Sequence, residues 1–238
     1  MKNIILNCLP PFSINTPSPA LSILKSYLIK NNFPTSIIYW NLLFHKSQTD
    51  FVWNNPKVLE DISNELAIYV NYIISEMGND TVKNSFKQIL RGYSPQYYNT
   101  NYEHYEVHMN RFINEIDRII DSNLSKINFN NTLFCGFSIK MDGWIVASII
   151  AKKIKKIHPD IPIVVGGINT RKNAEVYLKS FPQFDIAMWG EGEMSIVELA
   201  KTIENRDYNF QTIPNIAYRE QNNIKISDNK NISFREKN

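Results

Sequence analysis

Four short segments of the chain combine glycine or proline with small polar residues, and these segments are the candidate ligand-binding loops. They are residues 10–19, 138–143, 166–169 and 190–193. Glycine allows backbone amides to approach a large flat ligand, because no Cβ stands in the way. The candidate binding residues are Pro11, Phe12, Ser13, Ser138, Lys140, Met141, Asp142, Gly166, Gly167, Asn169, Gly190, Glu191, Gly192 and Glu193.

These segments also have purely structural explanations. Gly166 and Gly167 could supply only a turn after a strand. Glu191 and Glu193 could be ordinary carboxylates at the start of a helix, where the macrodipole favours negative charge. Each signal is weak alone, and their grouping favours a ligand site.

Several common chemistries do not fit the sequence. Neither G-x-x-x-x-G-K-[ST] nor G-x-G-x-x-G occurs, and the carboxylates of segment 190–193 stand where a phosphate would need donors. His104 and His108 lie four residues apart but lack the H-E-x-x-H arrangement, so solvated surface is favoured over a metal site. No serine or cysteine nucleophile has a matched histidine. Cys8 and Cys135 are expected to be reduced, partly buried thiols. We predict no catalytic residue.

Strand and helix signals alternate along the chain. Apolar runs of strand length occupy residues 3–7, 36–40, 132–139, 161–165 and 184–189, and helical apolar spacing occupies 20–30, 142–156, 171–180 and 193–205. This alternation predicts an α/β fold with a doubly wound, Rossmann- or flavodoxin-like parallel sheet of about five strands. In such a sheet, ligands bind beyond the carboxyl ends of the strands, where the four segments fall.

Two further regions complete the predicted organisation. Long amphipathic stretches over residues 56–122 indicate a helical insertion, whose Tyr-rich part either packs or contacts a peptide, packing being favoured. Short strands around Asn222 and Asn223 predict a C-terminal β-hairpin. We therefore expect an α/β domain over 1–205 and a hairpin with a polar tail over 206–238.

The composition narrows the possible partners. The 238 residues carry a net charge of +3 without a basic cluster, which argues against nucleic acid. The longest apolar run, residues 144–151, is far shorter than the roughly 20 residues of a membrane span. Pro10 and Pro11 interrupt the N-terminal apolar stretch before it could serve as a signal peptide. We expect a cytoplasmic protein with no membrane partner.

The order of these motifs resembles a known family. The chain runs from a Pro-Pro-Phe loop to Gly-Phe-Ser, then Val-Val-Gly-Gly-Ile-Asn, then Phe-Asp-Ile-Ala-Met-Trp-Gly-Glu-Gly-Glu. Over roughly residues 3–220 this resembles the N-terminal cobalamin-binding domain of class B radical SAM proteins, most closely the subgroup that matures ribosomally made peptides. Ser138 stands before Gly166 and Gly167 at a spacing comparable to the Ser-x-Leu and Gly-Gly of cobalamin domains.

The resemblance implies a role for each loop. Ser138 would lie beside the nucleotide tail of cobalamin, and Gly166 and Gly167 would leave room for that tail. The 190–193 segment would lie near the corrin rim, and the 11–16 loop would face the cobalt. No histidine follows the first strand, so we expect cobalamin without protein histidine ligation.

The chain lacks the Cys-x-x-x-Cys-x-x-Cys that would hold a [4Fe–4S] cluster, and it ends where a radical SAM barrel would begin. The cluster and S-adenosylmethionine are therefore expected only in a missing or partner domain, and independent catalysis is not expected. The leading hypothesis is a cobalamin-binding module of a B12-dependent radical SAM enzyme for peptide maturation or methyl transfer. Its partners would be a radical SAM domain or subunit and a precursor peptide. The alternatives are a ligand-free interaction or regulatory domain and a flavin- or nucleotide-binding carrier.

Overall fold

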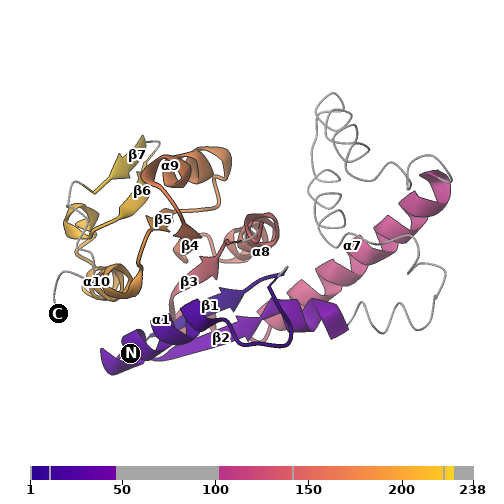
Figure 1. The fold of residues 1–238 in the computed structure, drawn as a ribbon, viewed down its shortest axis with the longest axis horizontal. Helices are drawn as coiled ribbons and strands as arrows, with labels where there is room; N and C mark the ends of the chain where they lie inside the picture. Colours follow the sequence, from indigo (N-terminus) through magenta and orange to yellow (C-terminus); the bar gives the residue numbers. More distant parts are fainter. Residues whose placement is uncertain (1, 11, 47–101, 141, 222, 228–238) are drawn as a thin grey trace. The chain divides into compact units, whose positions relative to one another are not determined.

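A computed structural model describes residues 2–10, 12–46, 102–140, 142–221 and 223–227. The chain divides into two compact units, Met1–Asn41 with Ile127–Asn238, and Leu42–Lys126. The predicted insertion, 56–122, falls in the second unit, and most of it, including the Tyr-rich segment, lies outside the described residues. Its described part is the helix α7 (Tyr102–Leu124) (Figure 1). The predicted domain boundaries stay a prediction.

The first unit is built on one mixed sheet in the order β2-β1-β3-β4-β5-β6-β7. Every neighbouring pair from β2 to β5 is parallel, and β6 and β7 are added antiparallel at the β5 edge. The strands are β1 (Asn3–Cys8), β2 (Thr35–Tyr39), β3 (Thr132–Ser138), β4 (Ile163–Ile168), β5 (Ile186–Trp189), β6 (Ile216–Glu220) and β7 (Asn223–Ile226). The predicted α/β class with a five-stranded parallel sheet and a C-terminal hairpin is confirmed. The hairpin joins the sheet itself, which the sequence had not indicated.

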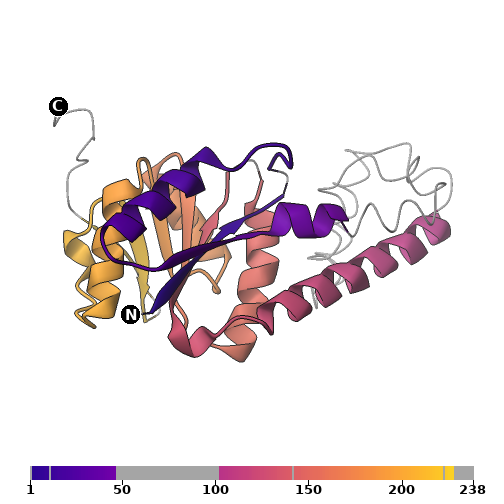
Figure 2. The ribbon, with the colours of Figure 1, turned by 90° about the horizontal axis from the view of Figure 1, so that it is seen from below.

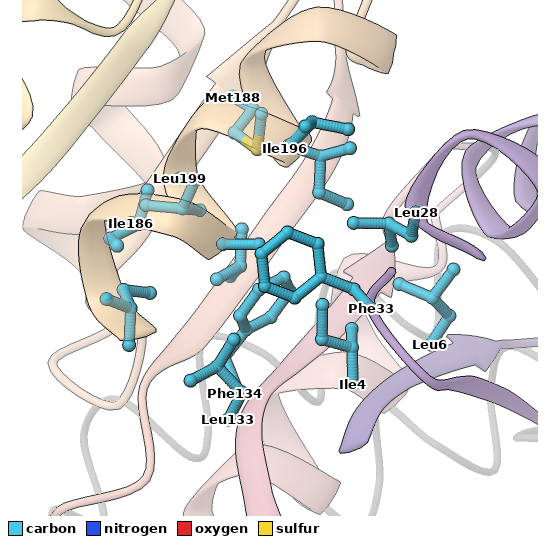
Figure 3. Close-up of a cluster of buried hydrophobic side chains, with 14 of the residues drawn as sticks. Ile4, Leu6, Leu28, Phe33, Leu133, Phe134, Ile186, Met188, Ile196 and Leu199 are labelled. Carbon is cyan, nitrogen blue, oxygen red and sulfur yellow. The ribbon is translucent and has the colours of Figure 1, made fainter. Parts of the chain in front are cut away.

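Two pairs of helices cover the sheet. Figures 1 and 2 show α1 (Pro19–Lys30) and α10 (Glu193–Glu204) on one face, with α8 (Trp144–Ile157) and α9 (Arg171–Ser180) on the other. The α1 and α10 face packs over alternate strand residues such as Ile4, Phe134 and Val164. Figure 3 shows this apolar cluster, in which side chains from α1, α10 and the strands interdigitate. This layer supports the carboxyl edge of the sheet, where β1 and β3 form the topological switch point.

A buried amide ties the end of β1 to its neighbours. Asn7 is 2% exposed. Its Nδ2 donates to Gly136 O on β3 at 3.0 Å, and its Oδ1 accepts from Trp40 Nε1 at 2.8 Å. Trp40 directly follows β2 and begins a helix. Because buried polar groups require partners, this network sets the register of three adjacent strands at the edge where ligands would bind.

At the opposite, amino end of the strands, the side chain of Asp185 also connects neighbouring elements. Its Oδ2 accepts from the backbone N of Ile163 at 2.7 Å and pairs with Lys155 Nζ at 2.7 Å. The carboxylate therefore joins α8 to the starts of β4 and β5. Both ends of the sheet are thus held by polar side chains.

Replacing Asn7 by alanine is expected to lower the free energy of unfolding by about 1–3 kcal/mol, because Trp40 Nε1 loses its acceptor inside the fold. Trp40→Phe should cost a similar amount, because Asn7 Oδ1 then loses its donor. Urea unfolding measures both. The matched control is Asn3→Ala, which removes the exposed bond from Asn3 Nδ2 to Ser36 Oγ between β1 and β2. Equal losses at Asn3 and Asn7 would contradict the buried network.

The two cysteines are free and buried, as the sequence suggested. Burial raises the pKa of Cys8 from 9.0 to about 11. It raises the pKa of Cys135 to about 12, against a smaller lowering effect of the Lys155 charge. Both thiols therefore stay protonated in the folded protein at neutral pH.

Those shifts predict a loss of stability in alkali. In the unfolded chain the thiols ionise near pH 9.0, whereas the folded chain keeps them neutral up to about pH 11. A raised pKa of this kind leaves stability intact below pH 9 and lowers it as the pH rises further. Urea unfolding between pH 8 and 11 should show this decline, and Cys8→Ala should make it shallower. Identical slopes for the two proteins would rule out the Cys8 contribution.

Candidate functional site

A cavity of about 250 Å³ lies at the carboxyl edge of the sheet, on the α1 and α10 face. Its floor consists of strand residues that point to the same side, together with Phe137. They are Leu6, Gly136, Ser138, Val164, Gly166 and Met188. Leu6, Val164 and Met188 also belong to the apolar cluster of Figure 3, so the cavity lies at the carboxyl-end margin of that packing. This is the position where open α/β sheets bind ligands.

The walls of the cavity are the first turns of two helices. Ala20, Leu21 and Leu24 come from α1, and Glu193 and Ile196 come from α10. Helix α1 is capped by Ser18 Oγ, which accepts from Leu21 N at 3.4 Å. Helix α10 has Gly192 at its N-cap, with no side-chain cap. The cavity is therefore apolar in its depth and has helix N-termini at its margin.

The β4 glycines lie within the strand rather than after it, which corrects the sequence interpretation. Strand β4 runs to Ile168, and its pairing with β5 shifts register between Val165 and Ile168. A Cβ on Gly166 would meet nothing within 4 Å. Gly167 has a φ of +81°, and a Cβ there would lie 3.1 Å from Lys140 Cγ and 3.6 Å from Ser138 Oγ. The lack of a side chain at Gly166 thus leaves open space at the floor of the cavity, whereas Gly167 allows the backbone to adopt a positive φ.

The Gly190–Glu193 loop forms the wall beyond β5. Gly190 has a φ of +70°, and a Cβ there would lie 3.5 Å from Asn215 Nδ2. A Cβ on Gly192 would lie 3.6 Å from Leu24 Cδ2, so this glycine lets the loop pass close to α1. Glu191 is exposed and Glu193 is partly buried. All four residues of the loop line the cavity.

The remaining predicted residues divide into two groups. Ser138 and Lys140 line the cavity, but the exposed Asp142 and Asn169 do not. Asp142 has a φ of +66° and its charge raises the pKa of Tyr177 on α9, after the larger effect of burial. Met141 and Pro11 lie outside the described residues.

The first loop is held from behind rather than placed in the cavity. Neither Phe12 nor Ser13 lines the cavity, and Phe12 packs partly buried against the apolar cluster. Asn41 Nδ2 donates to the backbone oxygens of Phe12 and Ser13 at 3.3 and 3.1 Å. Asn41 is 3% exposed, so a buried amide fixes the path of the loop.

Sequence reasoning missed several residues that shape the site. Gly136 was predicted only as part of a strand, although a Cβ there would lie 2.9 Å from Leu6 Cδ2. A glycine inside an apolar run was its available signal. The sequence did not indicate the roles of Asn41 and Asn215, because the chain is rich in asparagine and the residues that these two contact are distant in sequence.

The charges at the site do not form a catalytic arrangement. Lys140 brings one cationic group to the lining, and Glu191 and Glu193 bring two carboxylates. Among the described residues, no group of three or more His, Cys, Asp or Glu could hold a metal ion. In that same part of the chain, no helix is long and apolar enough to cross a membrane.

No family model and no curated protein matches the chain. Among solved structures, it is similar to a radical S-adenosylmethionine methyltransferase, TsrM, from Kitasatospora setae. The TsrM structure with tryptophan substrate and a SAM analogue bound matches with a TM-score of 0.48 and 13% identity, and the match covers 95% of this chain and 30% of that chain. The TsrM structure with cobalamin and a [4Fe–4S] cluster bound matches with a TM-score of 0.44 and 13% identity, and the match covers 94% of this chain and 28% of that chain. The chain thus spans less than a third of those structures.

The two β4 glycines are expected to respond differently to alanine. Gly167→Ala should lower the free energy of unfolding by about 1–2 kcal/mol, because an L-residue is strained at positive φ. Gly166→Ala should leave stability unchanged or slightly increased, because its methyl group meets open space. Urea unfolding of the two variants tests this directly. If Gly166→Ala lowers the free energy of unfolding as much as Gly167→Ala does, the space at Gly166 is not open.

Proposed function

We propose that this chain is a cobalamin-binding module. The observation that carries the proposal is the meeting of three predicted segments, at Ser138, Gly166 and Gly190, around one cavity at the carboxyl edge of the sheet. The resemblance of those segments to cobalamin-binding domains is the reason why we propose cobalamin as the ligand.

The size of the cavity suits part of such a ligand. Its volume of about 250 Å³ lies below the roughly 300–1,000 Å³ that holds a whole drug-sized molecule. We place the nucleotide tail in the cavity, over the open position at Gly166 and beside Ser138. The corrin ring then lies outside, against the Gly190–Glu193 loop and the loop that contains Phe12 and Ser13.

The residues present fit cobalamin held without a protein histidine. The two histidines whose side chains are described lie elsewhere: His45 is exposed, and His158 stacks on Phe129 with ring centroids 4.5 Å apart. Neither lines the cavity. Bound cobalamin would supply methyl-group relay or assistance to a radical step. The chain itself would orient the cofactor and exclude water from its tail.

The cobalamin module would act together with a radical SAM domain or subunit that carries the [4Fe–4S] cluster and S-adenosylmethionine. This part of the proposal rests on the motif order Pro-Pro-Phe, Gly-Gly-Ile-Asn and Gly-Glu-Gly-Glu. For the same reason we propose a precursor peptide as substrate of the assembled enzyme.

Hydroxocobalamin tests the proposal. The purified chain, mixed with hydroxocobalamin and freed of excess by gel filtration, should retain the corrin absorption bands. Gly166→Leu should reduce retention at least tenfold, because its side chain fills the floor, while Gly166→Ala keeps most of it. The spectrum of the complex should lack protein nitrogen ligation to cobalt.

Lys172→Leu provides the matched control, because it adds the same side chain at an exposed position on α9. It should bind like the parent chain. A colourless parent chain would refute cobalamin binding and favour a ligand-free interaction domain, and a yellow chain from expression would indicate a flavin instead. Full binding by Gly166→Leu would place the tail elsewhere.

A further inference from the structure

Three buried acceptor oxygens without a hydrogen-bond partner lie at the carboxyl edge of the sheet. In the described part of the chain, the buried side-chain atoms that lack a partner are Asn41 Oδ1, Glu193 Oε2, Asn215 Oδ1 and Arg219 Nε. Arg219 belongs to the other end, where its backbone N bonds Asp185 O. The unpaired groups near the site are therefore all acceptors.

Two of these acceptors flank one loop of the cavity. Glu193 is a lining residue, and Asn215, which is 9% exposed, stands behind Gly190. Asn215 is held in place by its backbone, since its carbonyl accepts from Trp189 N at 3.1 Å and its own φ is +58°.

A buried acceptor without a donor costs roughly 1–3 kcal/mol, so natural proteins keep few of them. Glu193 itself is partly buried, and Oε2 is its buried oxygen without a partner. Among the described residues none donates to Glu193 Oε2, whereas Glu198 on the same helix accepts from Lys201 Nζ at 2.8 Å. A donor from outside the chain would remove this cost.

We propose that Glu193 is a specificity-determining residue that accepts a hydrogen bond from an uncharged N–H or O–H group of the ligand. The inference deepens the proposed function, on which it rests for the identity of the ligand. It assigns the wall at Gly190–Glu193 to amide or hydroxyl groups and excludes an anionic group there. The positive charge of Lys140, also at the lining, is left for any phosphate.

A pair of small probes tests the acceptor independently of cobalamin. Benzimidazole is a flat bicycle with one ring N–H, and 1-methylbenzimidazole lacks that donor. Both fit the volume and the apolar floor. Chemical-shift titration of the full chain should give a dissociation constant about tenfold lower for benzimidazole, and Glu193→Met should abolish that difference.

Two variants control for structure and for charge. Glu198→Met makes the same change on the exposed face of α10 and should leave both titrations unaltered. Glu193→Gln keeps an acceptor without the charge and should retain part of the discrimination. Glu193→Met should unfold at a urea concentration equal to or above that of the parent, because the change removes a buried oxygen that has no donor in the described fold.

The outcomes separate this inference from the proposed function. Equal binding of the two probes, no binding of either, or unchanged discrimination in Glu193→Met would overturn the acceptor role. Retention of hydroxocobalamin by the parent chain would leave the proposed function standing in those cases. Loss of hydroxocobalamin binding with intact probe discrimination would overturn only the identity of the ligand.

Discussion

The whole carboxyl edge of the sheet depends on the buried amide of Asn7. Its bonds to Trp40 and Gly136 fix where β1 ends relative to β2 and β3, on the sheet face that α8 and α9 cover. The same register places Leu6 and Gly136 side by side on the opposite face, as the floor of the cavity. A polar bond on one face thus determines the shape of a binding surface on the other.

Polar groups are treated differently at the two ends of the strands. At the amino end, Asp185 Oδ2 accepts from Ile163 N and pairs with Lys155, and the buried group without a partner is a donor, Arg219 Nε. At the carboxyl end, Glu193 and Asn215 keep acceptor oxygens that nothing in the described chain satisfies. Sites that bind ligands commonly retain such unfavourable features because the ligand compensates for them. The unpaired acceptors of the described chain all lie at the carboxyl end, where we propose the ligand site.

Periodicity and residue type were enough to predict the elements, since buried parallel strands appear as continuous apolar runs and their covering helices as amphipathic ones. The same reasoning ends β4 at Val165, because paired glycines after an apolar run usually indicate a loop. In the structure a register shift carries the ladder through Gly166 and Gly167 to Ile168. The roles of Asn7, Asn41 and Asn215 could not be predicted, because each depends on partners brought together only by the fold. Asn7 and Trp40, for example, are 33 residues apart.

The antiparallel hairpin gives β5 a hydrogen-bonded neighbour on both sides. With β6 paired along it, β5 is an interior strand, and β7 is the last strand of the described sheet on that side. The turn into β6 also delivers Asn215 to the back of the Gly190 loop. The Gly190 loop of the cavity is therefore supported from behind by a turn that lies beyond α10 and leads into the hairpin. An excised or transplanted binding module would need to carry those strands with it.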